Sequence, residues 1–208
     1  GLPEGVTAQA ANAAEKLGMA GKWVFTIQYP IMEPFLKYSE NRDLRKQLFT
    51  AYFMKGDNDN EFDNKAIISK IARLRVERSK LLGYDTYADF VLERNMAKTP
   101  ERVFDFLEQI WKAALPVAKA EAAAQQEIIN REGGRFRLEP WDWWYYTEKI
   151  KKEKYALDDE AIRPYFRTEN VIEGMFYVAN RLYNLNFTQR NDIPKYHPDV
   201  VTFEVTRD

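Results

Sequence analysis

Most of this 208-residue chain carries apolar residues at the spacing of an amphipathic helix. The pattern predicts helices over residues 40–55, 63–82, 100–132, 142–155 and 168–185. The stripe on the third of these helices consists of Val103, Leu107, Ile110, Ala114 and Val117. Stripes of this width bury one helix face against a core, so the pattern predicts a mainly α fold.

Residues with capping preferences mark the expected ends of these helices. Ser39 is the expected N-cap of the helix over residues 40–55, and Asp158 is expected to cap a short helix. Thr99 is the expected N-cap of the longest helix, with Pro100 in its first position, where a missing N–H costs nothing. Gly83 is the expected stop of the helix over residues 63–82.

Two segments have the composition of strands. Residues 22–29, KWVFTIQY, are β-branched and aromatic. Residues 199–205, DVVTFEV, alternate between apolar and polar positions, as a half-buried strand does. A small amount of β structure is therefore expected near these two positions. The chain has no Pro/Gly-rich linker, so we expect residues 1–208 to form a single helical lobe.

Composition excludes several classes of function. Lys plus Arg number 31 and Asp plus Glu 32, so a net charge of −1 gives no general attraction to nucleic acid or to an anionic membrane. No apolar run approaches the roughly 20 residues of a membrane helix. Neither nucleic acid nor membrane is an expected partner. The absence of cysteine permits a cytoplasmic location, which we expect, and it is also compatible with a periplasmic one.

The supply of metal ligands and nucleophiles is small. With no cysteine and one histidine, the chain cannot build a thiolate nucleophile, a cysteine-bound zinc site or an H-E-x-x-H motif. The one histidine, His197, stands beside Pro198 in a segment typical of a loop. A role as a general base would require an orienting partner, and the sequence does not identify one.

Residues 139–146, EPWDWWYY, are the densest aromatic stretch. One interpretation is a packed core in which Asp142 caps the following helix. The other is an aromatic surface beside a ligand channel. On either interpretation Trp141, Trp144, Tyr145 and Glu148 have the spacing to share one helix face. The acids Glu139, Asp142 and Glu148 also allow a sugar-binding or glycosidase interpretation, but that chemistry needs two carboxylates at a defined separation.

Six segments in order resemble the thimet-oligopeptidase-like family of zinc metallopeptidases, most closely its bacterial peptidyl-dipeptidase branch. The most specific are MAKTPE at residues 96–101, PWDWWYY at 140–146 with LDDEAIRPYF at 157–166, and YHPDV at 196–200 leading into FEV. The resemblance covers essentially the whole chain. It implies part of a multi-helix lobe of the thimet-oligopeptidase/neurolysin-like fold.

The resemblance also implies an activity for the parent protein. Family members hold zinc with H-E-x-x-H and a downstream glutamate, and they cleave short peptides; the peptidyl-dipeptidase branch releases C-terminal dipeptides. None of these ligands matches a residue of this chain. We therefore expect an internal fragment without a catalytic or metal-binding residue, which shapes the substrate channel for a catalytic part elsewhere in the same polypeptide.

Candidate channel residues are Trp141, Asp142, Tyr145, Tyr146 and His197. The alternative is a free-standing helical interaction module without enzymatic activity. In the family, the strand at residues 199–205 is followed by a returning strand. We therefore expect it to lack its antiparallel partner here and to be frayed or paired with another chain.

Overall fold

The computed structural model describes residues 1–156 and 159–207, and contacts divide the chain into two compact units, Gly1–Tyr155 and Ala156–Asp208. The structure is mainly helical with one small sheet, which confirms the expected fold class. The expected cap at Asp158 lies outside the described residues. None of the described helices combines the length and the apolar character that crossing a bilayer requires.

The first unit contains four of the five helices that the apolar pattern predicts and three shorter helices that it does not predict. Their bounds are α1 (Glu4–Lys16), α2 (Tyr29–Tyr38), α3 (Arg42–Phe53), α4 (Lys65–Leu81), α5 (Tyr87–Leu92), α6 (Pro100–Arg131), the 3-10 turn η1 (Pro140–Asp142) and α7 (Trp143–Tyr155). The Thr99 hydroxyl accepts the Arg102 N–H at 3.4 Å, as expected of an N-cap. Gly83 follows α4 with φ +83°, a left-handed conformation that favours glycine.

The expected N-cap at Ser39 is wrong. Ser39 ends α2 instead, where its N–H donates to the Phe35 carbonyl at 2.9 Å. The N-cap of α3 is Asn41, whose side-chain oxygen accepts the Leu44 N–H at 3.1 Å. A helix in front of Ser39 was not expected, and that helix uses the Ser39 N–H for its own last turn.

The expected strand at residues 22–29 is also wrong. The segment is irregular up to Gln28, and Tyr29 already belongs to α2, with Pro30 in its first turn. Val24 donates one backbone hydrogen bond to Ala10 of α1 (3.0 Å), and the Phe25 ring meets Phe35 edge-on at 4.5 Å. Composition favours an extended backbone here, but a strand requires a neighbouring strand to complete its ladder, and this segment lies against helices.

We call the packed part of the first unit the helical block: α1, α2, α3, residues 122–131 of α6, η1 and α7. Within it α2 packs on α1, α3 and α7, and the end of α6 packs on α7. Its buried apolar side chains are Val6, Ala10, Ala14, Met32, Phe35, Leu36, Ile128, Ile129 and Tyr146. The core of the first unit therefore lies at the junction of these helices.

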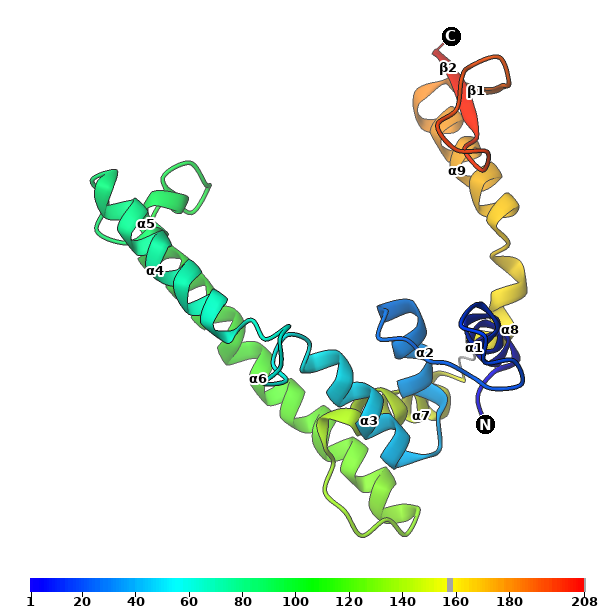
Figure 1. Cartoon of the computed structure of the whole chain (residues 1–208), viewed down its shortest axis with the longest axis horizontal. Coiled ribbons are helices and arrows are strands. Elements are labelled where there is room, and N and C mark those ends of the chain that lie inside the picture. Colours follow the sequence, from blue (N-terminus) through cyan, green and yellow to red (C-terminus); the bar gives the residue numbers. More distant parts are fainter. Residues whose placement is uncertain (157–158, 208) are drawn as a thin grey trace. The chain divides into compact units, whose positions relative to one another are not determined.

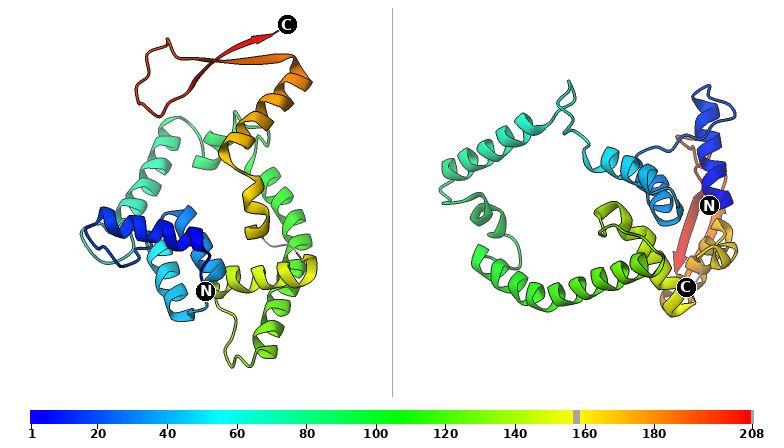
Figure 2. Two further views of the ribbon diagram at one scale, coloured as in Figure 1. Left: turned by 90° about the vertical axis from the view of Figure 1, so that its right-hand side faces the viewer. Right: turned by 90° about the horizontal axis from the view of Figure 1, so that it is seen from below.

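We call the remaining helices of this unit the arm: α4, α5 and residues 100–117 of α6. Figure 1 shows α4 leading away from α3, and α6 returning toward α7 after the short α5. The two long helices run as separate rods, as the second view in Figure 2 shows. The arm is held mainly by local contacts: Arg75 lies 5.2 Å from the Tyr87 ring centre and Arg78 lies 5.0 Å from that of Phe90.

The second unit is a helix followed by a hairpin. Its elements are α8 (Asp159–Ile162), η2 (Arg163–Tyr165), α9 (Thr168–Tyr183), β1 (Leu185–Arg190) and β2 (Thr202–Arg207). Asn184, left-handed at φ 55°, ends α9 and leads directly into β1. Phe176 of α9 packs against Phe187 (4.1 Å between ring centres) and Phe203 (4.9 Å), so the helix covers one face of the hairpin.

The strand expected at residues 199–205 is confirmed, although it begins at Thr202 and continues to Arg207. The expectation that it lacks an antiparallel partner is wrong. It pairs with β1 in an antiparallel register that sets Phe187 opposite Val205 and Arg190 opposite Thr202. Four of the six residues 185–190 are polar and the segment directly follows a helix, so its apolar pattern did not indicate a strand.

Candidate functional site

The Asp142 carboxylate is the centre of the most heavily bonded polar cluster in the block. Its side chain is 0% exposed. Arg42 Nε donates to Oδ1 (3.0 Å) and Oδ2 (3.1 Å), and Arg42 Nη2 donates to Oδ2 (2.8 Å). Arg45 Nη2 donates to Oδ1 (2.9 Å). The cluster therefore ties α3 to η1, at the start of α7.

Arg45 is as deeply buried as the acid it binds. Its side chain is 2% exposed, and its Nη1 donates to the backbone carbonyls of Ser39 (2.7 Å) and Glu40 (3.3 Å). Hydrogen bonding to Asp142 raises the pKa of the Arg42 guanidinium. A buried charge is tolerated only when it is paired and hydrogen-bonded, so each of these groups depends on the others.

Asp142 was expected to act as a helix cap, but most of its side-chain hydrogen bonds are to two arginines of α3. Its Oδ2 accepts the Glu139 N–H at 3.2 Å, and this bond closes the 3-10 turn. The two arginines were missed because they stand 97 and 100 residues earlier in the chain. The one available signal was their spacing of three on a predicted helix, which puts both side chains on one face.

The other expected site residues of this stretch divide between core and surface. Tyr146 is 6% exposed and packs with Ile128 and Ile129, and burial raises the pKa of its hydroxyl. Tyr145 is half-buried, with Arg45 4.2 Å and Lys149 4.6 Å from its ring centre.

Trp141 is half-buried on the side of the cluster that faces α3. Its ring lies 6.3 Å from that of Phe49, and Lys46 lies 4.9 Å from its ring centre. The structure thus brings Trp141, Asp142 and Tyr145 together around α3, while Tyr146 lies in the core.

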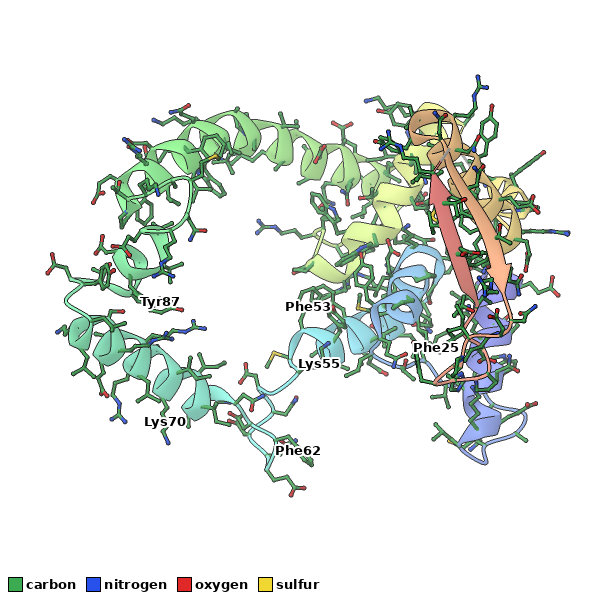
Figure 3. The ribbon with its side chains drawn as sticks, turned by 90° about the horizontal axis from the view of Figure 1, so that it is seen from above. Phe25, Phe53, Lys55, Phe62, Lys70 and Tyr87 are labelled. Atoms are coloured by element: carbon green, nitrogen blue, oxygen red, sulfur yellow. The ribbon has the colours of Figure 1, made fainter. Side chains whose placement is uncertain are left out.

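An aromatic groove of about 460 Å³ opens beside this cluster, between α3, α6 and the start of α7. Its main lining residues are Phe49, Phe53, Leu138, Glu139, Trp143 and Trp144. Phe53 is 55% exposed at the end of α3, where Figure 3 labels it. The Phe49 ring lies 4.3 Å from Phe53 and 6.0 Å from Trp144, so the rings form one continuous wall. Such a wall can bind a flat or apolar group.

A second cavity of about 600 Å³ lies between α6 and α7 and includes Gln125, Trp143 and Thr147. The buried Gln125 side chain donates to the Thr147 hydroxyl at 3.1 Å. Its contacts hold the two helices together, and they show no arrangement of catalytic groups.

His197 belongs to the second unit. Its side chain is 59% exposed, and its Nδ1 accepts the backbone N–H of Asp199 at 3.3 Å. This is the loop conformation that the sequence indicated. The groove and the Asp142 cluster consist of residues of the first unit only.

Three acids converge at the base of the arm. Asp57, Asp59 and Asp63 each place a carboxylate oxygen 2.6–2.8 Å from the Lys65 ammonium. The Lys65 ammonium occupies the position that a metal cation would take, and it donates a hydrogen bond to each of the three carboxylates. This cluster therefore closes the turn before α4.

Comparisons with known proteins identify the family. Residues 35–208 match the model of Peptidase family M3. The chain is 36% identical over 206 residues to "Dipeptidyl carboxypeptidase" of Escherichia coli K12, an alignment that covers 99% of this chain and 30% of that protein. It is 36% identical over 209 residues to "Oligopeptidase A" of Haemophilus influenzae, with the same coverage. Identity to "Saccharolysin" of Saccharomyces cerevisiae is 30% over 210 residues, covering 96% of this chain and 29% of that protein.

The class is therefore that of the metallopeptidases, as the sequence motifs indicated. This chain belongs to peptidase family M3, a family of zinc metallopeptidases. It spans about 30% of the length of the first curated relatives it matches.

The residues described here do not fit the zinc centre that this family implies. A catalytic zinc takes three protein ligands of nitrogen, oxygen or sulfur type. Across residues 1–156 and 159–207, no group of three or more His, Asp or Glu side chains is arranged to hold a metal ion. Asp142, the most deeply buried acid of the site, is fully engaged by two arginines. No catalytic step through zinc follows from these residues.

Proposed function

We propose that this chain is a non-catalytic part of an M3 zinc peptidase that cleaves short peptides and releases dipeptides from their C-termini. Zinc and the catalytic groups are supplied by another part of the same polypeptide. The printed names of two similar proteins, a dipeptidyl carboxypeptidase and an oligopeptidase, support the substrate class. We assign the protein to the cytoplasm, a location that zero cysteines allow.

The observation that carries this proposal is the bare apolar surface of the arm. The exposed large side chains there include Ile67, Ile68, Ile71, Leu74, Phe104, Phe106, Leu107, Ile110, Trp111 and Val117. Apolar surface in water costs roughly 25 cal/mol per Å², so the exposed apolar residues along α4 and along α6 indicate an interface. Because the chain belongs to family M3, we propose that another part of the same enzyme covers this surface.

Within that enzyme the helical block would hold a wall of the substrate channel in place. Arg42, Arg45 and Asp142 fix α3 against the start of α7, and the aromatic groove lies between these two helices. A wall held by buried ion pairs keeps its shape when a substrate enters, which lowers the entropy that binding must remove. We therefore propose that Trp141, Asp142 and Tyr145 support a channel wall from behind.

A free-standing interaction module remains the second candidate, because the same bare arm would suit a separate partner protein. The reading frame that carries these residues distinguishes the two. An M3 peptidase requires that it also encode H-E-x-x-H, whereas an interaction module does not.

The decisive experiment uses the complete natural gene product. Purified protein is incubated with a short peptide bearing a free C-terminus and with its C-terminally amidated form. We expect stoichiometric zinc by elemental analysis and dipeptides released only from the free form. The 208 residues alone are expected to bind no stoichiometric zinc and to release no dipeptide. Cleavage by these residues that survives repurification would contradict the division of labour proposed here.

A further inference from the structure

We propose that the aromatic groove between α3 and α7 binds an arginine side chain of a peptide. The inference rests on the proposed function, since it assigns a residue preference to an enzyme that acts on peptides. The groove is lined by rings from two helices, and among its described lining residues Glu139 alone carries a charge. The occupant that matches this surface is flat, partly apolar and positive.

The neighbouring rings show how this part of the molecule uses its aromatic faces. Arg42 lies 4.1 Å from the Phe136 ring centre, and Arg45 lies 4.2 Å from that of Tyr145. Lysines lie over two further rings, Lys46 over Trp141 at 4.9 Å and Lys55 over Tyr52 at 3.9 Å. Rings around the groove are thus already paired with cations of the chain itself, an arrangement that ring quadrupoles favour.

The rings of the groove itself are different. In the described part of the chain, no cation lies over Phe49, Phe53, Trp143 or Trp144. Two of these side chains come from α3 and two from α7, and Phe53 is largely exposed. These rings pack against one another but not against a cation, so an incoming guanidinium can stack on the exposed side of Phe53.

Glu139 selects against a purely apolar occupant. A neutral apolar side chain in the groove would desolvate this carboxylate without pairing it. A guanidinium offers two parallel N–H donors to a carboxylate and stacks on an aromatic ring with its flat face. Arg42 lies near Glu139 but is committed to Asp142 by three hydrogen bonds. The Glu139 side chain takes part in a capping box with Asp142, but no cation of the described residues forms an ion pair with it, so its charge is left for a ligand.

The groove is also preformed. The ion pairs of Asp142 hold α3 and the start of α7 together, and Phe49 contacts both Trp141 and Trp144. A volume of about 460 Å³ falls within the range of roughly 300–1,000 Å³ typical of ligand sites. Binding therefore requires little rearrangement of the walls.

The test compares two peptides that differ in one charge. Acetyl-Ala-Arg-Ala-amide and its citrulline counterpart have the same shape, but citrulline is neutral. We expect the arginine peptide to quench tryptophan fluorescence and to bind about five- to tenfold more tightly by calorimetry, the range for a cation–π contact combined with an exposed ion pair. The complete gene product and the 208-residue chain are both titrated.

Two variants localise the preference. Glu139→Gln is expected to reduce the arginine-to-citrulline ratio to about twofold or less, and Glu61→Gln, in an exposed loop, is expected to leave it unchanged. Phe53→Leu, at a largely exposed position, is expected to weaken both peptides without removing the preference for arginine. Near-ultraviolet circular dichroism of each variant shows whether the aromatic packing is retained.

Equal affinity for arginine and citrulline would overturn the inference, as would no binding of either peptide at millimolar concentration. Binding to the 208 residues that disappears in the complete protein would also overturn it, since the groove would then be covered by the rest of the chain. In each of these cases normal release of dipeptides would leave the proposed function intact. An absence of peptidase activity together with a clear arginine preference would reject the proposed function instead.

Discussion

The helical block and the arm use the same kind of sequence to opposite effect. Both consist of amphipathic helices, yet the block buries its apolar stripes and the arm leaves its stripes in water. One helix shows the contrast within itself: on α6, Ile129 is 0% exposed and Ile110 is 48% exposed. The apolar periodicity therefore shows which face of a helix requires burial, but it does not show whether this part of the chain buries it.

Polar groups differ between the two regions in the same way. In the block a buried acid is bonded to two arginines from a distant helix. In the arm the ion pairs are exposed and local, such as Arg73 with Glu77 one turn later. A buried, paired charge specifies one arrangement of helices, whereas an exposed pair adds less than about 1 kcal/mol.

The largest expected effect comes from removing the central acid of the block. Asp142→Ala leaves Arg45 buried without its counter-charge, so we expect a loss of about 3–5 kcal/mol in the free energy of unfolding. Urea denaturation of the 208-residue chain measures it. The matched change in the arm, Asp105→Ala, removes an exposed carboxylate and is expected to stay within about 0.5 kcal/mol. Similar losses from both variants would remove the distinction between the two regions.

The next effect compares two isoleucines on one helix. Ile129→Ala opens a cavity in the core and is expected to cost about 2–5 kcal/mol. Ile110→Ala removes a half-exposed side chain from the arm, so we expect less than about 1 kcal/mol in the same assay. In the complete gene product the cost of Ile110→Ala should rise toward that of a core residue. If the cost of Ile110→Ala stays below about 1 kcal/mol in the complete gene product, the rest of the enzyme does not cover the arm.

The smallest effect concerns the turn at the base of the arm. The hydrogen bond from the Lys65 ammonium lowers the pKa of the Asp63 carboxyl from 3.8 to about 2. Since the folded pKa is depressed, the stabilisation is complete above pH 3.8 and is lost as the pH falls through about 2. A carbon-detected NMR titration should place the Asp63 midpoint near 2, and Lys65→Met should return it toward 3.8. A midpoint near 3.8 in the unmodified chain would mean that the turn is open in solution.

Much of the helical architecture could be predicted from the sequence, because helix signals are local. Thr99, Pro100 and Gly83 act within one turn of the positions they mark, and each lies where it was expected. Strand signals are not local in this sense. Residues 22–29 have strand composition without a partner, whereas residues 185–190 form a strand because β2 lies beside them. The sequence identified β2 and missed the segment that completes it.

The candidate site shows the same limit. Composition singled out residues 139–146 as either a core or a channel wall, and the structure divides them residue by residue: Tyr146 lies in the core and Trp143 lines the groove. The arginines that hold Asp142 could not be found from a single sequence, because nothing in the local pattern pairs residues so far apart. Family membership, in contrast, rests on motifs that are read directly, and it was predictable in full.

The clamp on Asp142 also has a consequence for the order of folding. Its partners stand 97 and 100 residues before it, so α3 stays without this contact until η1 has been synthesised. At about 5–20 residues per second, translation of that interval takes roughly 5–20 s. Contacts between the end of α6 and α7 span far shorter distances, such as the 22 residues from Gln125 to Thr147, and can form first. Until then, the faces of α2 and α3 that pack on α7 and η1 stay uncovered for seconds during synthesis.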